Sequence, residues 1–512
     1  MSRRSADKVV FGTKFAERGE ASEMMGILEA MAGECCSRNQ TLRRYRSMGG
    51  KTLSDFIRQG EELVRRNREV EPLADPAELE NLVHEQAARL VGESAAEGVV
   101  RAVRSGAVCT ADHHGGLYFA QAFQGDILFS LLLERLGFGE PTVPILCAGQ
   151  VELENASYAR GICASMIPDA KQYFPIFPAK DSVQLASYAE PVNTQMLARF
   201  RHRFLEKEDA AGNEALREAL DGILKAAYER EEVLSLPRFS DQVTRIGAAL
   251  TGKLFAGEGK TFIYLEMESL LTPLLEKELA DPCSLPARLL WSDTLRRNLL
   301  QERLEDGVTV AEALFWGADE KGRKFHLTLT PDGWLEGKDW RGQSVRYPAD
   351  PASLEALLAE RKIFPGVFLM VLISFFERSL TWLGGMFQSA YLPGYQKALV
   401  SVLERGGLMR EARTIGAYDC SGYISGPVFG LYRGNGFAAP AAPVEAFPNR
   451  LELARVRELV EKTDLWDAHL MGLADIYFDL IGRKDRKEDW YAVIGRELYD
   501  RYPDHRLTGY ES

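Results

Sequence analysis

Apolar side chains recur every three or four residues along most of the first hundred residues, which is the period of an amphipathic helix. The clearest runs are Leu53–Ile57–Leu63 and Leu79–Leu82–Val83–Ala87–Leu90. Ser54 and Asp75 are residue types that cap helix N-termini, and Pro76 suits the first helical position after Asp75. The pattern therefore predicts a helical N-terminal region over residues 1–105.

The periodicity changes directly after this region. Ala107 to Thr110 is a short apolar run, and Val143 to Ala148 is a second one. Between them lies the apolar face of a helix, formed by Phe123, Ile127, Leu128, Leu131 and Leu132. A strand, a helix and a strand in this order predict a βαβ unit, with parallel strands and a right-handed crossover. The chain is therefore expected to contain an α/β core with a parallel sheet.

The rest of the chain alternates between helical and strand patterns. Residues 195–232 are charged and helical, and Gly259 to Met267 predicts a strand that leads into a helix. Phe325 to Trp334 contains Pro-Asp-Gly, a hairpin turn signal. The apolar run from Val367 to Trp382 is expected to be buried. Gly434 to Pro443 has the composition of a linker, and residues 449–512 are expected to form C-terminal helices.

Composition narrows the class of protein. With 512 residues, 46% of them hydrophobic and 27% charged, the chain can form two or three globular domains. A net charge of −12 argues against general binding to nucleic acid or to anionic membranes, which requires basic surface. No apolar run is long enough to span a bilayer, and the N-terminus lacks the apolar segment of a signal peptide. The seven cysteines form no C-x-x-C pair, so a cytoplasmic protein with reduced thiols is expected.

Candidate chemistry gathers where the two predicted strands end. The first strand runs into Asp112-His113-His114-Gly115-Gly116, and the second is followed by Gln150, Glu152, Glu154 and Asn155. Ligands of open α/β sheets bind beyond the carboxyl ends of the strands. Both polar groups are therefore expected at one edge of one sheet, where they would form a binding or catalytic site.

These side chains allow several roles. His113 and His114 suit phosphate binding or proton transfer, with Asp112 orienting one of them, and the two glycines would let backbone N–H groups approach an anion. Glu152 and Glu154 lie two residues apart, so on an extended segment they would face the same side and hold Mg²⁺ or an amine. The alternatives are a histidine pair that caps a helix or packs in the core, and two solvated loop charges.

Several segments, in order, resemble motifs of the bacillithiol synthase family, whose members add cysteine to a glucosaminyl-malate amine. Thr110, His113 and Gly115 are similar to the family's T-G-x-Q-P-G motif, with Ala111 and His114 at its Gly and Pro positions. The strand V-P-I-L-C-A at Val143 to Ala148 resembles V-P-V-F-W-I-A. The segment L-G-G-M-F-Q-S-A-Y at Leu383 to Tyr391 resembles I-G-G-x-x-E-x-A-Y. The resemblance covers roughly residues 105–400.

The chain also departs from the family at polar positions. Where the family has an acidic residue, this chain has Gln388. Met370-Val371 takes the place of the family's Arg-Pro pair, and Asp126 takes the place of its lysine. The resemblance thus indicates a divergent relative. It implies a Rossmann-like core over residues 106–435, with a helical insertion at about 195–306, followed by a linker and helical cap over residues 436–512.

The leading hypothesis is a ligase-like enzyme that joins an amino acid, with cysteine as one candidate, to an amine, using ATP and Mg²⁺. The resemblance places Thr110, Gly384, Gly385, Gln388 and Tyr391 in the pocket. Arg433, in a glycine- and tyrosine-rich tract at 421–436, could bind a carboxylate or a phosphate. The expected partners are an amino acid and an amine, and a homodimer is left open.

Two other functions fit parts of the same pattern. The Asp-His-His triplet resembles a motif of DHH phosphoesterases, which would make the chain a metal-dependent phosphohydrolase. Those enzymes also need closely spaced aspartates on an upstream strand, and residues 1–105 contain none. A non-catalytic ligand-binding relative is the third hypothesis, because several polar positions of the family are changed.

Overall fold

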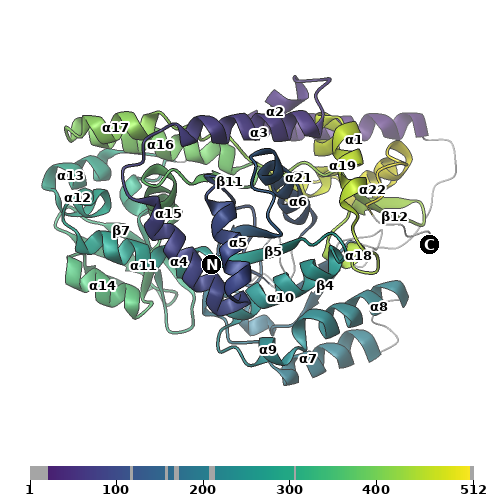
Figure 1. Cartoon of the computed structure of the whole chain (residues 1–512), viewed down its shortest axis with the longest axis horizontal. Helices are drawn as coiled ribbons and strands as arrows, with labels where there is room; N and C mark the ends of the chain where they lie inside the picture. Colours follow the sequence, from purple (N-terminus) through teal and green to yellow (C-terminus); the bar gives the residue numbers. More distant parts are fainter. Residues whose placement is uncertain are drawn as a thin grey trace.

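The computed structural model of the chain describes residues 21–115, 119–155, 160–165, 172–206, 214–304 and 307–507 (Figure 1). Its central sheet consists of parallel strands in the order β11-β1-β2-β5. The strands are β1 (Ala107–Cys109), β2 (Thr142–Cys147), β5 (Thr261–Glu266) and β11 (Thr381–Leu383). Helix α6 (Ala120–Arg135) connects β1 to β2, which confirms the predicted parallel βαβ unit in a mixed α/β fold.

Alternate residues of each strand enter two separate hydrophobic cores, because side chains of a strand point to opposite faces of the sheet. Cys109, Ile145 and Tyr264 belong to one core, and Val108 and Leu265 belong to the other. Helices therefore cover both faces, which makes the sheet the middle of three layers.

Terminal helices and the helices of the long connection from β2 to β5 supply the first core. They are α1 (Ala21–Arg38), α2 (Gln40–Arg46), α3 (Leu53–Arg68), α6, α7 (Thr194–Arg201), α8 (Glu214–Ile223), α9 (Glu231–Leu234), α10 (Phe239–Leu254), α18 (Pro443–Ala446), α19 (Leu453–Lys462), α20 (Leu465–Met471), α21 (Leu473–Leu480) and α22 (Trp490–Arg501).

The second core is built on the opposite face. Its helices are α4 (Pro76–Val91), α5 (Glu93–Val103), α11 (Met267–Ala280), α12 (Leu285–Trp291), α13 (Asp293–Gln301), α14 (Pro351–Ala359), α15 (Val367–Val371), α16 (Gln388–Arg405) and α17 (Met409–Gly416). The N-terminal helices thus contribute to both cores.

The predicted N-terminal helices are present, with one correction to their caps. Asp75 accepts a hydrogen bond from the Ala77 N–H, and Pro76 occupies the first helical position, as expected. Ser54 lies inside α3, whose N-cap is Thr52. Thr52 and Asp55 cap each other's backbone N–H groups, so the helix begins one residue before the predicted cap.

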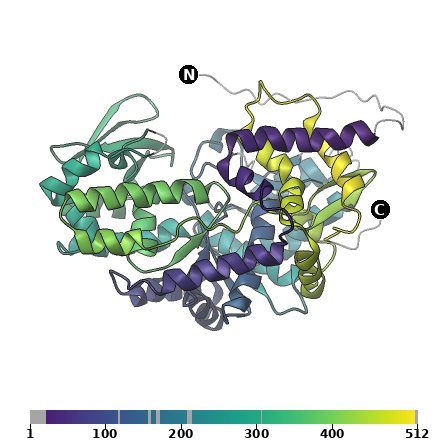
Figure 2. The same ribbon diagram turned by 90° about the horizontal axis from the view of Figure 1, so that it is seen from above.

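A second, antiparallel sheet has the strand order β10-β6-β7-β8-β9. Its strands are β6 (Phe315–Ala318), β7 (Lys324–Leu329), β8 (Trp334–Lys338), β9 (Ser344–Pro348) and β10 (Ile363–Pro365). The predicted hairpin at Pro331-Asp332-Gly333 joins β7 to β8, with Gly333 at a φ of 78°. Figure 2 shows these strands at the end of the molecule away from the terminal helices.

The C-terminal part corrects the predicted linker. Gly434 to Pro443 forms instead a buried antiparallel hairpin and the start of α18. The hairpin strands are β12 (Leu431–Gly434) and β13 (Phe437–Pro440), and a smaller hairpin pairs β3 (Gly161–Ala164) with β4 (Gln172–Pro175). Helix α1 lies beside α21 and α22, which joins the two ends of the chain (Figures 1 and 2). Among the described residues, no helix is both long and apolar enough to cross a bilayer.

Leu265→Ala should lower the free energy of unfolding by about 2–5 kcal/mol, because Leu265 on β5 is fully buried in the second core and its truncation leaves a cavity. Met409→Ala, at a side chain that is 47% exposed, should change it by less than about 0.5 kcal/mol. Urea unfolding followed by circular dichroism measures both. Equal effects would contradict the assignment of Leu265 to a core.

Candidate functional site

The parallel sheet places four chain segments at its carboxyl edge. The chain passes from β1 through α6 to β2 on one side, and β11 joins β1 on the other side. In such sheets the crevice between the first strand and its two neighbours is the usual ligand site. Thr110 follows β1, Gly149 and Gln150 follow β2, and Gly384 follows β11, so the predicted meeting of these segments occurs.

The first and last of the predicted motifs meet beside β1. The Thr110 hydroxyl donates to the Gln388 side-chain oxygen at 2.9 Å, and Gln388 is buried. Gly384 lies against this pair, and a methyl group on it would approach the same Gln388 oxygen to 1.3 Å. The contact shows that residues 278 positions apart share one edge of the sheet, as the motif order indicated.

The glycine- and tyrosine-rich tract covers this part of the edge. The backbone N–H groups of Ile424 and Ser425 donate to the Gly384 carbonyl at 3.0 and 3.1 Å. Ser425 also packs against Gly125 of α6, where an added methyl group would lie 2.7 Å from its Cβ. Residues 423–429 are therefore buried and cover this part of the edge.

The Asp-His-His triplet runs along β2, but its three side chains have different surroundings. The His114 N–H and the Ala148 N–H donate to carbonyls across the two segments. The His114 ring is buried, with Nε2 2.7 Å from the Ser240 carbonyl oxygen. Burial lowers the pKa of His113 to about 4, so its imidazole is neutral at pH 7. Asp112 makes no hydrogen bond to either histidine, which corrects its predicted orienting role.

A pair of glutamates at the end of β5 forms the main acidic group of this edge. Glu268 accepts hydrogen bonds from the Gly149 N–H at 2.7 Å and from the Gln150 N–H at 3.0 Å. Glu266 accepts from Arg238 at 2.7 Å. Burial and the neighbouring Glu266 raise the pKa of Glu268 to about 7. This carboxyl is poised to take up or release a proton near neutral pH.

The antiparallel sheet adds a cation to the same place. Lys324 on β7 donates to the Gln150 carbonyl at 3.3 Å and lies 4.9 Å from the centre of the Trp316 ring. Burial lowers the pKa of its ammonium group, against the opposing attraction of Glu152 and Glu268. The amine is thus held near two carboxyl groups at the contact between the two sheets.

Glu266, Glu268 and Lys324 were not predicted from the sequence to belong to the site. The strand at 261–266 was predicted, and its end carries two acids two residues apart, which is the same spacing that drew attention to Glu152 and Glu154. This spacing was the available signal. Lys324 had none, because nothing in its own segment shows that β7 lies against the parallel sheet.

Glu152 and Glu154 do not converge as predicted. Glu154 is exposed and pairs with Arg160 at 2.7 Å, whereas the charge of Glu152 acts on Lys324. Asn155 donates to the Glu152 carbonyl at 2.8 Å. Within the described residues, neither glutamate belongs to a group of three potential metal ligands. This part of the structure does not support Mg²⁺ binding at the pair.

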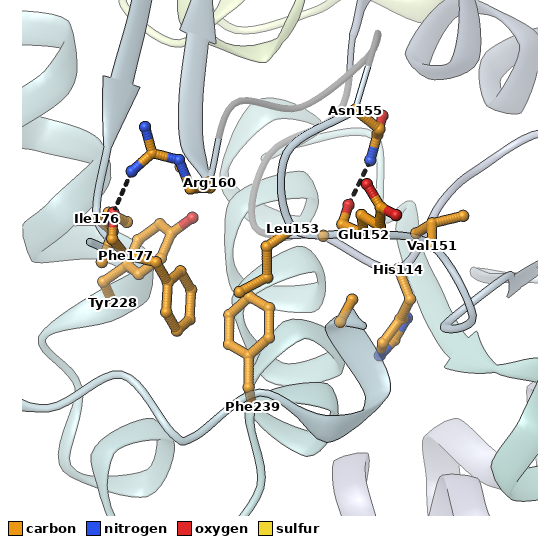
Figure 3. A pocket seen from close by; sticks show the side chains of 13 residues that line it. His114, Val151, Glu152, Leu153, Asn155, Arg160, Ile176, Phe177, Tyr228 and Phe239 are labelled. Atoms are coloured by element: carbon orange, nitrogen blue, oxygen red, sulfur yellow. Dashed lines mark hydrogen bonds between the residues drawn. The ribbon is translucent and has the colours of Figure 1, made fainter. Parts of the chain in front are cut away.

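A narrow cavity lies beside His114. Figure 3 shows Leu153 and Phe239 between Tyr228 and His114 in its wall. Among the described residues, neither the buried Tyr228 hydroxyl nor the buried His114 Nδ1 has a hydrogen-bond partner. Gly115 lines the same cavity. The wall of the cavity is therefore mostly apolar, and Glu152, Asn155 and Arg160 add polar groups to it.

Four further residues were predicted to belong to the site. Tyr391 is 39% exposed and packs on Tyr395, so it does not share the buried surroundings of Gln388. Arg433 donates to the Tyr502 carbonyl at 3.0 Å and lies over the Tyr499 ring, which makes it part of the C-terminal packing. Gly116 lies outside the described residues, and Gly385 pairs with Ser425 through the backbone.

Gly384→Ala should destabilise the protein by about 1–3 kcal/mol, because the methyl group must displace Gln388 and break its bond to Thr110. Gly385→Ala is the matched control: no atom lies within 4 Å of the added methyl group, so its effect should stay within about 1 kcal/mol. Thermal unfolding of both variants compares them. A more harmful change at Gly385 would contradict the described edge.

The raised pKa of Glu268 makes stability depend on pH. Above pH 4.5 the carboxyl ionises in the unfolded chain while it stays protonated in the folded one, so its contribution to stability falls as the pH rises to about 7. Glu268→Gln removes this loss. The unfolding midpoint of the variant, relative to the original protein, should therefore rise between pH 4.5 and pH 7. A difference that stays constant across this range would contradict the pKa shift.

Glu266, Glu268, Lys324 and the buried histidines thus gather acid, base and cation at the carboxyl ends of β1, β2 and β5. Comparison with known proteins finds no matching family model, no matching curated protein and no matching solved structure.

Proposed function

We propose that the chain is a small-molecule enzyme with a Rossmann-like core that joins the carboxyl group of an amino acid to an amine. The observation that carries this proposal is Glu268, a buried carboxyl with a pKa of about 7 at the carboxyl ends of β2 and β5. Strongly shifted pKa values at a strand edge are typical of catalytic groups. The resemblance to bacillithiol synthases supports the same reaction class.

The chemistry of condensation explains why such a group would be needed. An amine is protonated at neutral pH, and it must lose a proton before or during its attack on a carboxyl carbon. A base works best when its pKa lies near the working pH. In this proposal Glu268 accepts that proton, with its carboxyl held in place by the N–H groups of Gly149 and Gln150.

Lys324 would bind the acidic part of the substrate. It lies beside Glu268 and Glu152 and is half-buried, so its charge is only partly screened by water. A substrate carboxylate next to its ammonium group would be held close to Glu268. The His113 imidazole is neutral and would serve as a hydrogen-bonding group rather than as a cation.

ATP and Mg²⁺ remain part of the proposal only through the resemblance. Condensation of a free carboxyl requires an activating group, and ATP would supply it. The Glu152 and Glu154 side chains do not fit a magnesium site, since they face different partners. No step is assigned to the metal, and the cytoplasm is the proposed location.

Turnover tests the proposal directly. Amino acids, amines and ATP with Mg²⁺ are combined with the full chain, and coupled products and nucleotide release are followed by mass spectrometry. Glu268→Gln should lower kcat/KM by about 100-fold or more, as expected for the loss of a general base. Glu62→Gln, an exposed change of the same type on α3, should leave it unchanged.

Two results would overturn the proposal. One is full activity of Glu268→Gln. The other is stabilisation by ligands without any product across the substrate panel, which would favour a non-catalytic binding protein. The folded state of each variant is checked by its unfolding midpoint.

A further inference from the structure

A second group of acidic side chains, which does not include Glu268, lies where β1 meets helix α6. Cys109, Asp112 and Asp126 are all buried, and one potential ligand atom from each lies within 4.8 Å of the other two. Cys109 is the last residue of β1, Asp112 follows in the next loop, and Asp126 belongs to α6. Three segments of the crossover therefore meet at one point.

Within this group, the Asp126 carboxyl accepts hydrogen bonds from two side chains, whereas no described side-chain or backbone donor bonds to Asp112. The Tyr264 hydroxyl donates to one oxygen of Asp126 at 2.9 Å, and the Cys109 thiol donates to the other at 3.3 Å. Asp112 is 1% exposed, and both of its carboxyl oxygens lack a hydrogen-bond donor in the described part of the chain. Buried carboxylates are almost always paired with a donor or a cation, whereas the neighbour of Asp112 is a second carboxyl group, that of Asp126.

The negative charge of the Asp112 and Asp126 carboxyl groups must be neutralised either by protons or by a cation. Burial and the proximity of Asp126 raise the pKa of Asp112, and burial raises the pKa of Asp126 to about 7. Two carboxylates this close cannot both stay charged in a dry site unless a positive charge lies between them. Among the described residues, no lysine or arginine acts on the pKa of either aspartate.

We infer that Cys109, Asp112 and Asp126 form a buried site for one divalent transition-metal ion, with Zn²⁺ as the best match. A thiolate with carboxylates suits zinc, whereas Mg²⁺ and Ca²⁺ prefer oxygen ligands alone. Ligand atoms around a tetrahedral zinc lie about 3.5 Å apart, so the cluster needs only small side-chain movements. The Tyr264 hydroxyl, already bonded to Asp126, lies beside the site.

Proton balance is simple for this site. Binding of the ion displaces the Cys109 thiol proton and the one proton that the two carboxyl groups would otherwise share. Two protons leave and two positive charges enter, so the net charge of the cluster does not change. The ion would bond β1, the following loop and α6 together. This inference does not depend on the proposed ligase activity.

Metal analysis of the full chain tests the inference. The protein is produced in medium with added Zn²⁺ or Co²⁺, purified without chelators and examined by elemental analysis. About one ion per chain is expected, as is a sulfur-to-metal charge-transfer band with Co²⁺. Cys109→Ser and Asp112→Asn should lose most of the ion. Cys420→Ser, another buried cysteine, should retain it.

A variant that fails to fold cannot show whether the cluster binds a metal ion. The second measurement is therefore made on the original protein. X-ray absorption of the bound ion should show one sulfur neighbour together with oxygen neighbours. Either of two findings would overturn the site: bound ion that persists in Cys109→Ser, or an original protein with only trace metal. In the second case, Asp112→Asn should unfold at an equal or higher temperature, because the pair then only shares a proton.

Discussion

Backbone hydrogen bonds among the four parallel strands determine where most of the candidate functional groups lie. Strand β1 has three residues, yet it pairs in parallel with both β2 and β11, and its register continues into His113 and Thr110. Parallel strands end at the same edge. Segments that begin near residues 110, 149, 266 and 384 must therefore meet, whatever side chains they carry.

The acidic side chains at this edge form two pairs of buried carboxyl groups that lie close to each other. Glu266 and Glu268 form one buried pair, and Asp112 and Asp126 form another, and in each pair burial raises a pKa toward neutrality. Apolar side chains of similar size would be as stable or more stable at such positions. The two pairs therefore indicate selection for chemistry or for ligand binding rather than for stability.

Local patterns were sufficient to predict the parallel βαβ unit, the β5 strand and the hairpin at Gly333, because each depends on residues close together in the sequence. The family resemblance placed Thr110 and Gln388 in one pocket, and their side chains are hydrogen-bonded to each other. The surroundings of single side chains were not predictable. Arg433 packs on Tyr499, and Gly434 to Pro443 is buried, because elements distant in the sequence supply their partners.

The two halves of the sheet's carboxyl edge differ in what covers them. Beside β1 and β11, the chain's own segment around Ser425 bonds to Gly384 and packs on Gly125, so a ligand there would have to displace a buried strand-like segment. Beside β2 and β5, Lys324 is half-buried and its partners are a carbonyl and carboxyl groups that water or substrate can replace. Lys324 is therefore the more accessible of the two charged groups at this half of the edge, and Glu268 is buried beside it.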